Sequence, residues 1–196
     1  MNIALFDFDG TITKADTLLK FIRFAVGDFS FLAGLIILSP ILIAFKLKII
    51  SNFKAKQIML SWFFKGFREE DFKNLAFHYS ISQIDYIVRL GALERLYWHA
   101  EQGHKIVIVS ASVENWLAPW CKKNGFELLA TQLEFKNGVV TGNLLSRNCF
   151  GIEKVNRIKE RYDLSKFEYV YAYGDSKGDI QMLELANESF YKPFKK

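Results

Sequence analysis

Acidic and hydroxyl side chains gather in three short segments of this sequence, each of which directly follows an apolar run. In chain order the segments are DFDGT at 7–11, SAS at 110–112 and GDSKGD at 174–179. Carboxylates are the ligands of hard divalent cations, and hydroxyl groups can hydrogen-bond phosphate oxygens. If the fold brings the three segments together, they predict a site for a metal ion and a phosphoryl group.

Asp7 and Asp9 are two residues apart, so their side chains point the same way if the backbone there is extended. Two carboxylates at such a short distance repel each other, so they need a cation or a shared proton between them. Mg²⁺ fits this need because proteins bind it through one or two carboxylates, water and a substrate phosphate. We therefore expect a Mg²⁺ site at Asp7 and Asp9, with Asp175 as a further carboxylate.

An aspartate held beside a metal-bound phosphoryl group can attack it and form an aspartyl-phosphate. A second aspartate can protonate the leaving oxygen and later activate the water that attacks the intermediate. Phosphate oxygens also need donors and positive charge, which Ser110 at a strand end and Lys154 at a helix start can supply. Gly10 allows the sharp turn that has to follow the first two aspartates.

Three apolar runs read as buried strands, at 2–8, 105–109 and 169–173. Helical patterns follow two of them, at 113–123 and 178–186. This alternation predicts an α/β fold with a central parallel sheet flanked by helices, whose ligands bind at the carboxyl ends of the strands. The Asn-Gly pair at 137–138 lies between two β-prone runs and predicts a hairpin over 133–140.

Residues 15–89 interrupt the alternation because they contain no convincing strand. Helical stretches are expected there at 17–26, 31–46, 53–64 and 69–88. We therefore divide the chain into a catalytic core at 1–14 and 90–196 and a helical insert at 15–89.

Charge and apolar residues are unevenly distributed along the chain. The composition, 51% hydrophobic and 16% aromatic, excludes disorder. Residues 14–68 hold nine Lys or Arg against two Asp, which gives +7, so the rest of the chain carries −2 of the net +5. This segment favours an anionic partner, but its apolar filling and the lack of a nucleic-acid motif argue against nucleic acid.

The stretch at 29–45 has 17 residues without a charge and is followed by Lys46 and Lys48. It is short for a membrane-spanning helix and contains Pro40. We expect it to be buried within the insert. The alternative is that it lies in a membrane interface with the lysines at anionic headgroups.

Other residues favour packing roles and a reducing compartment. Cys121 and Cys149 form no CxxC pair and read as small core residues, and the N-terminus lacks the features of a signal peptide. We expect a cytoplasmic protein, or one that is peripheral at the inner face of the membrane. The three histidines have no metal-ligand spacing, and Trp116, Leu117 and Trp120 fit a helix that packs on the sheet.

The DxDGT motif at 7–11, Ser110, Lys154 and the GDSxxD motif at 174–179 together resemble the four motifs of the haloacid dehalogenase (HAD) superfamily. The resemblance covers the core and implies a Rossmann-like fold, a bound Mg²⁺ and hydrolysis of phosphate monoesters. It implies that Asp7 is the nucleophile and a metal ligand, and that Asp9 is the acid/base and binds the metal through its carbonyl oxygen. By the same comparison the remaining site residues fall into two sets. Asp175 is a metal ligand, with Asp179 and Ser176 in support. The residues expected to bind the substrate phosphate are Ser110, Lys154, Gly10, Thr11 and Ala111.

The insert resembles the cap of subfamily IB, which contains phosphoserine phosphatase, and its apolar start is similar to the phosphatidylglycerophosphatase C type of enzyme. Asp16 is the one candidate for a substrate contact from this cap, and no equivalent of the carboxylate-binding arginine of phosphoserine phosphatase is found. A small-metabolite phosphate and a lipid phosphate, including phosphatidylglycerophosphate, both remain as substrates. From other classes, a phospho-aspartate signalling receiver and a non-catalytic membrane-binding protein remain as alternatives. The sequence does not indicate an oligomeric state.

Overall fold

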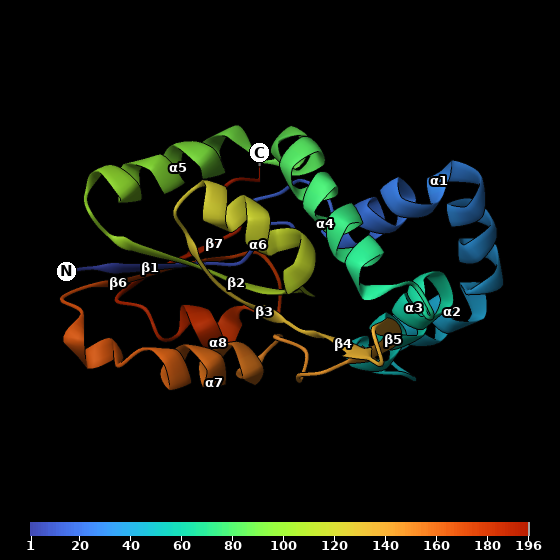
Figure 1. The fold of residues 1–196 in the computed structure, drawn as a ribbon. Coiled ribbons are helices and arrows are strands. Elements are labelled where there is room, and N and C mark those ends of the chain that lie inside the picture. The colour runs from blue at the N-terminus through green and yellow to red at the C-terminus, as the bar shows by residue number, and fades with distance from the viewer. Residues whose placement is uncertain (196) are drawn as a thin grey trace.

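A five-stranded parallel sheet forms the centre of the computed structural model, which describes residues 1–195 (Figure 1). The strand order is β3-β2-β1-β6-β7. The strands are β1 (Ile3–Phe6), β2 (Lys105–Val113), β3 (Glu127–Thr131), β6 (Val170–Gly174) and β7 (Glu188–Tyr191). The expected α/β fold with a parallel sheet is confirmed, although β3 and β7 were not predicted and β1 is shorter than 2–8.

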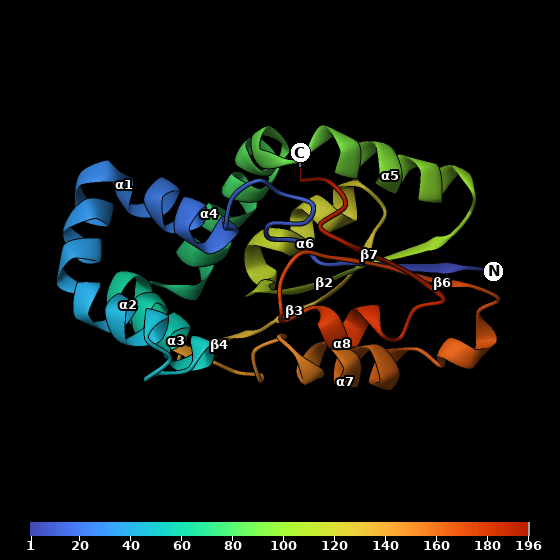
Figure 2. The ribbon, with the colours of Figure 1, turned by 180° about the vertical axis from the view of Figure 1, so that it is seen from behind.

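Alternating side chains of β1 pack into two different layers. Ala4 and Phe6 belong to the larger core cluster with residues of α5 (Leu90–Glu101) and α6 (Glu114–Lys123). Ile3 and Leu5 belong to the second cluster with residues of α7 (Ile152–Arg161) and α8 (Ile180–Leu183). Figure 2 shows these helix pairs on opposite faces of the sheet. The helix expected at 178–186 is shorter than predicted, since α8 spans only four residues. A short 3₁₀ helix, η2 (Leu164–Lys166), precedes β6.

The helical insert consists of α1 (Thr17–Ile37), α2 (Ser39–Lys46), α3 (Asn52–Phe64) and α4 (Glu69–Gln83), followed by the 3₁₀ helix η1 (Ile84–Ile87). A kink divides α1 at Gly27, whose φ of 77° is one that glycine adopts without steric cost. The helix expected at 31–46 is in fact two helices. Pro40 stands in the first turn of α2, where the missing N–H has no helical partner to lose.

Aromatic stacking fixes the insert to the core. Phe21 of α1 stacks on Trp116 of α6 with ring centroids 4.6 Å apart, and both side chains are buried. The expected packing roles of Trp116, Leu117 and Trp120 are confirmed, since all three are buried on α6.

The expected hairpin is confirmed as β4 (Leu133–Lys136) and β5 (Val139–Leu144), which form a separate antiparallel sheet. The hairpin is bonded to the loop between α3 and α4. Gly66 N–H donates to the Val140 carbonyl at 2.9 Å, and Val140 N–H donates to the Phe67 carbonyl at 2.9 Å. This part of the chain after residue 90 therefore packs with the insert.

The apolar stretch at 29–45 is largely exposed, which contradicts its expected burial. Only Gly34 and Leu38 are buried in it, because its helices contact the rest of the insert along one side. Within residues 1–195 no single helix has the length and hydropathy of a membrane span, whereas α1 and α2 taken together, with a bend of 60° between them, do.

Both cysteines and His99 are packing residues, whereas His78 lies at the surface. Cys121 and Cys149 are buried and unbridged. His99 is fully buried, with Nε2 at 2.9 Å from the Tyr173 hydroxyl and Nδ1 at 2.8 Å from Nδ1 of His104.

Candidate active site

Asp7 follows the last residue of β1 and is held at the carboxyl edge of the sheet. Its backbone N–H donates to the Tyr173 carbonyl of β6 at 2.9 Å, so the strand pairing continues one residue past β1. Gly10 then turns the chain with a φ of 89°, and a Cβ atom there would lie 2.7 Å from the Asp175 carboxylate. Only glycine allows this loop to come so close to Asp175.

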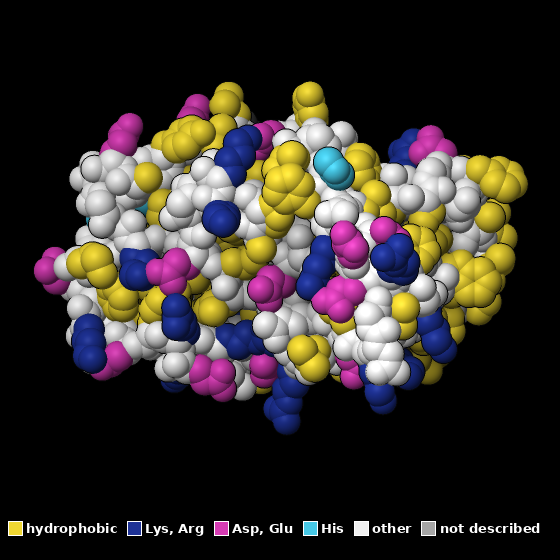
Figure 3. Space-filling view, viewed as in Figure 1, with side chains coloured by type: hydrophobic (Ala, Val, Ile, Leu, Met, Phe, Trp, Pro, Cys, Tyr) yellow, Lys and Arg dark blue, Asp and Glu magenta, His cyan; other side chains and the backbone are white. Residues whose placement is uncertain are grey.

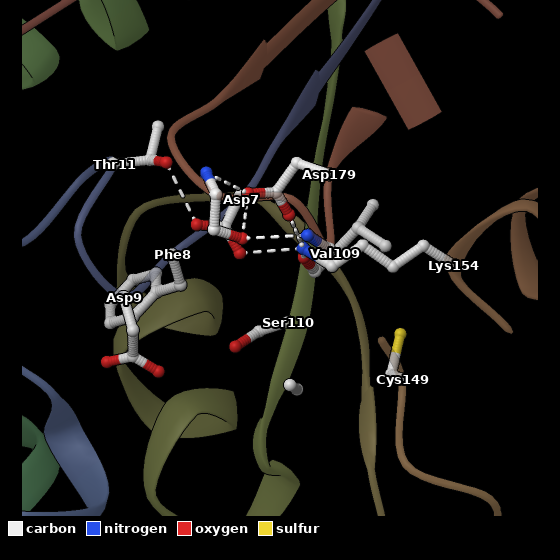
Figure 4. A network of polar contacts seen from close by, with 12 residues as sticks. Asp7, Phe8, Asp9, Thr11, Val109, Ser110, Cys149, Lys154 and Asp179 are labelled. Carbon is white, nitrogen blue, oxygen red and sulfur yellow. Dashed lines mark hydrogen bonds and ion pairs between the residues drawn. The ribbon is translucent and has the colours of Figure 1, made fainter. Parts of the chain in front are cut away.

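Lys154 joins two of the three segments through ion pairs (Figure 4). Its Nζ lies 2.6 Å from Oδ1 of Asp7 and 2.8 Å from Oδ1 of Asp179, and donates to the Val109 carbonyl at 2.7 Å. All three charged side chains are buried. A buried charge is stable only when it is paired and hydrogen-bonded, which this arrangement achieves for one ammonium and two carboxylates.

Asp7, Asp175 and Asp179 form the carboxylate group of the site. One oxygen from each lies within 4.8 Å of the others. The Thr11 hydroxyl donates to Oδ2 of Asp7 at 2.9 Å, and Lys195 pairs with Asp175 at 2.5 Å. Carboxylate oxygens are hard donors, so this set fits Mg²⁺.

Asp179 also orders the third segment, because its Oδ2 accepts hydrogen bonds from the backbone N–H groups of Asp175 and Ser176 and from the Ser176 hydroxyl. Sequence reasoning gave Asp179 and Ser176 only supporting roles. The structure places an Asp179 oxygen within the carboxylate group itself.

The Asp9 side chain lies apart from that group and points away from it in Figure 4. Its Oδ1 accepts from the Thr17 N–H at 2.7 Å, and its Oδ2 accepts from the Ser112 hydroxyl at 2.5 Å. The expectation that Asp7 and Asp9 share a cation through parallel side chains is therefore wrong, because β1 ends at Phe6 and the backbone does not continue extended to Asp9.

Ser110 lies within β2 and is buried, and its hydroxyl accepts from the Ser112 N–H at 3.0 Å. The strand continues to Val113 with a register shift against β3, so the helix after it begins four residues beyond Ser110. Ser110 therefore lies inside the strand and not at its end, where the sequence placed it. Ser112, which was not a candidate, contacts Asp9 directly.

A cavity of about 290 Å³ lies between the sheet edge and the insert. The core lines it with carboxylates, Lys154 and the segment at Ala111 and Ser112. The insert contributes mainly apolar side chains, which are Leu18, Leu19, Leu42, Phe45, Ala55 and Met59. The cavity thus has a charged floor and an apolar wall.

Two charged residues of the insert also line the cavity. Asp16, the expected cap contact, caps α1 by accepting from the Leu19 N–H at 3.2 Å. Lys56 of α3, which sequence reasoning missed, donates to the Ala111 carbonyl at 2.5 Å and to the side chain of Asn148 at 3.0 Å. Burial lowers the pKa of Lys56. Sequence reasoning missed Lys56 because a lysine within a helical pattern looks the same in the sequence whether it lines a cavity or lies at the surface.

Burial and pairing set the protonation of the site. Burial raises the pKa of Asp7 to about 6 against the opposing effect of Lys154, so Asp7 is ionised at neutral pH. Burial alone would raise the pKa of Asp179, but Lys154 holds it below its usual value. Burial, with Asp16 nearby, raises the pKa of Asp9 to about 7. The site therefore combines an ionised carboxylate at Asp7 with a carboxyl group at Asp9 that can hold or release a proton near neutrality.

The chain matches the model of the haloacid dehalogenase-like hydrolases over residues 4–184. Protein CicA from Caulobacter vibrioides (strain NA1000 / CB15N) is 32% identical, in an alignment that covers 98% of this chain and 86% of CicA.

Two solved structures share the fold. A protein of unknown function from Bordetella pertussis Tohama I has a TM-score of 0.82 at 22% identity and covers 96% of this chain and 88% of its own. The phospho-aspartyl intermediate analogue of phosphoserine phosphatase has a TM-score of 0.67 at 19% identity, with coverages of 95% and 84%. Together with the match of the family model, the strand order and the placement of its motifs, these likenesses identify the chain as a member of the haloacid dehalogenase-like hydrolase family, with a phosphoserine phosphatase-like fold.

Proposed function

We propose that this protein is a Mg²⁺-dependent phosphomonoester hydrolase that forms an aspartyl-phosphate on Asp7. The observation that carries the proposal is the carboxylate group of Asp7, Asp175 and Asp179, two of which, Asp7 and Asp179, are buried and paired with Lys154 at the floor of the cavity. Mg²⁺ held by Asp7 and Asp175, and by the Asp9 carbonyl oxygen as in the family, would neutralise phosphate charge and favour attack.

We assign a residue to each step. An oxygen of Asp7 attacks phosphorus while the ester P–O bond breaks, and Asp9 gives its proton to the leaving oxygen. Lys154 offsets the negative charge beside the phosphoryl group, and Ser110 with the neighbouring backbone supplies donors. Water then attacks phosphorus, Asp9 takes the water proton, and the bond to Asp7 breaks to release inorganic phosphate.

The direct test is to quench the enzyme in acid during turnover of a ³²P-labelled phosphate monoester. Acid-stable, hydroxylamine-sensitive label should appear on the peptide that contains Asp7, together with free phosphate. The Asp7→Asn variant should carry no label. Phosphate release without any labelled protein would refute the intermediate, and label without release would support the signalling receiver instead.

A second, narrower candidate is a phosphatidylglycerophosphate phosphatase that acts at a membrane surface. The specific observation in its favour is the apolar wall of the cavity, in which Leu42 and Phe45 of α2 face the charged floor. A panel of phosphoserine, sugar phosphates, polyol phosphates and phosphatidylglycerophosphate distinguishes the substrates. A rate at least about tenfold higher for the lipid would support this candidate, because apolar contact discriminates by that order.

A further inference from the structure

The outer side of the insert exposes a set of large apolar side chains that have no partner in the described chain. We call it the apolar end face, and it consists of Phe29, Leu32, Ile36, Ile37, Ile43, Leu47 and Ile49. Phe29 is 87% exposed and Ile36 is 73% exposed. Figure 3 shows hydrophobic side chains crowded at the end of the molecule that α1 and α2 occupy. Exposed apolar patches of this kind mark interaction surfaces.

After its kink, α1 has one side that packs on α3 and another side that belongs to the apolar end face. Phe29, Leu32 and Ile36 recur at helical spacing and form one stripe of α1 after its kink. Gly34 lies on the opposite side, where a Cβ atom would be 2.3 Å from the Phe63 ring of α3. The stripe is therefore not a packing surface within this fold.

The charge around the face is of one sign. Residues 29–68 contain no Asp or Glu, and Lys46, Lys48 and Lys54 are exposed beside the apolar residues. Within residues 1–195 these three lysines form no ion pair. A second copy of the chain would bring the same positive charge to the contact, which disfavours a dimer through this face.

We propose that the apolar end face docks on an anionic lipid bilayer. The apolar side chains enter the interface between headgroups and acyl chains, and the lysines contact anionic headgroups, which is the combination found in interfacial amphipathic helices. The docking orients the active site as well, because α2 lines the cavity through Leu42 and Phe45 while Ile43 and Leu47 lie on the apolar end face. Only this last consequence rests on the proposed phosphatase function.

The test is co-sedimentation of the full chain with vesicles of phosphatidylcholine alone and of phosphatidylcholine with an equal amount of phosphatidylglycerol. We expect binding to the anionic vesicles that weakens as salt is raised, and at least about tenfold weaker binding to the neutral ones. The double variant Phe29→Ser/Ile36→Ser should lose at least about tenfold in affinity for the anionic vesicles, and Lys46→Glu/Lys48→Glu should lose the preference for them.

The matched control is Leu90→Ser/Leu145→Ser, because Leu90 is 72% exposed and Leu145 is 66% exposed but both lie outside the insert. It should bind vesicles as the unchanged protein does. Thermal melts establish that each variant is folded.

Unchanged binding by the folded Phe29→Ser/Ile36→Ser protein would overturn the proposal. So would the absence of vesicle binding, and in that case a dimer in light scattering that this variant abolishes would identify a second copy as the partner. Phosphate release from an aryl phosphate is measured separately, so a protein that binds vesicles but is inactive would refute the proposed reaction and leave the docking intact.

Discussion

The sheet side and the insert side of the cavity differ in the partners of their charged groups. On the sheet side, Asp7 and Asp179 share the ammonium of Lys154 in a buried network. On the insert side the wall is largely apolar, and its cation, Lys56, donates to a carbonyl and an amide oxygen without a carboxylate partner among the described residues. On the sheet side the buried ammonium is thus fully paired, whereas on the insert side the ammonium of Lys56 has no carboxylate partner and can meet an anionic ligand. This difference suggests that the core determines the reaction and the insert determines which molecule undergoes it.

The largest effect is expected from Asp7→Asn, which removes the proposed nucleophile together with one carboxylate of the metal site and of the Lys154 network. Turnover of an aryl phosphate should fall by at least about 10³-fold, as is usual when a nucleophile is lost. Phosphate release and a thermal melt measure activity and folding separately. Turnover within tenfold of normal by the folded variant would break the assignment of the reaction to the sheet side.

Removal of divalent metal should have the next largest effect. Chelation should lower turnover by at least about 10²-fold, because the carboxylates of the site would repel the substrate phosphate. Mg²⁺ should restore the activity, whereas Ca²⁺ should restore much less because it prefers more ligands and longer bonds. Full activity after exhaustive chelation would contradict the metal site.

A smaller effect is expected on the insert side from Lys56→Met. Lysine has three donors and two are used by Ala111 and Asn148, so the third can contact an anionic group of the substrate. KM should rise about tenfold with a smaller change in kcat. Lys54→Met, an exposed neighbour on the same helix, is the matched control and should leave both constants unchanged. Equal fractional losses of kcat and kcat/KM in Lys56→Met would instead assign Lys56 to the chemical step.

The smallest effect concerns His99 of α5, which contacts the sheet through the Tyr173 hydroxyl of β6. Burial lowers the pKa of His99 from 6.5 to about 3, so the unfolded chain takes up this proton first as the pH falls. Its contribution to stability is therefore present above pH 6.5 and is lost between 6.5 and 3. Between pH 7.5 and 5.5 this amounts to about 1.4 kcal/mol, from the factor of one pKa unit.

Urea unfolding at the two pH values measures this loss. In the His99→Gln protein the loss of stability between pH 7.5 and 5.5 should be smaller by about 1.4 kcal/mol. In His78→Gln, at an exposed position, the loss of stability should equal that of the unchanged protein. An identical loss in the His99→Gln protein would show that other groups carry the acid sensitivity.

The sequence predicted the elements whose pattern is local. The apolar runs that became β1, β2 and β6, the Asn-Gly hairpin and the helices of the insert all carry their own signal. The strands β3 and β7 do not, because their partly exposed side chains show neither a continuous apolar run nor strict alternation.

The sequence predicted which residues form the candidate site better than it predicted how their side chains are oriented. Asp7, Lys154, Asp175 and Asp179 do meet, because strand ends in a parallel sheet share one edge. The orientation of Asp9 was not predictable, since it depends on where β1 ends and on the N–H of Thr17 at the start of α1. Lys56 was missed because its role comes from a contact between α3 and the core that lies 55 residues away along the chain.

The bonds between the β4–β5 hairpin and residues 66–69 have a mechanical consequence. Glu69 N–H donates to the Gly138 carbonyl at 2.8 Å, next to the bonds of Val140, so hairpin and insert form one body. The chain then passes between this body and the sheet four times, before α1, after η1 and on either side of the hairpin. The hairpin therefore belongs mechanically to the insert although it follows residue 90 in the chain, and any displacement of the insert that changes the cavity would carry the hairpin with it.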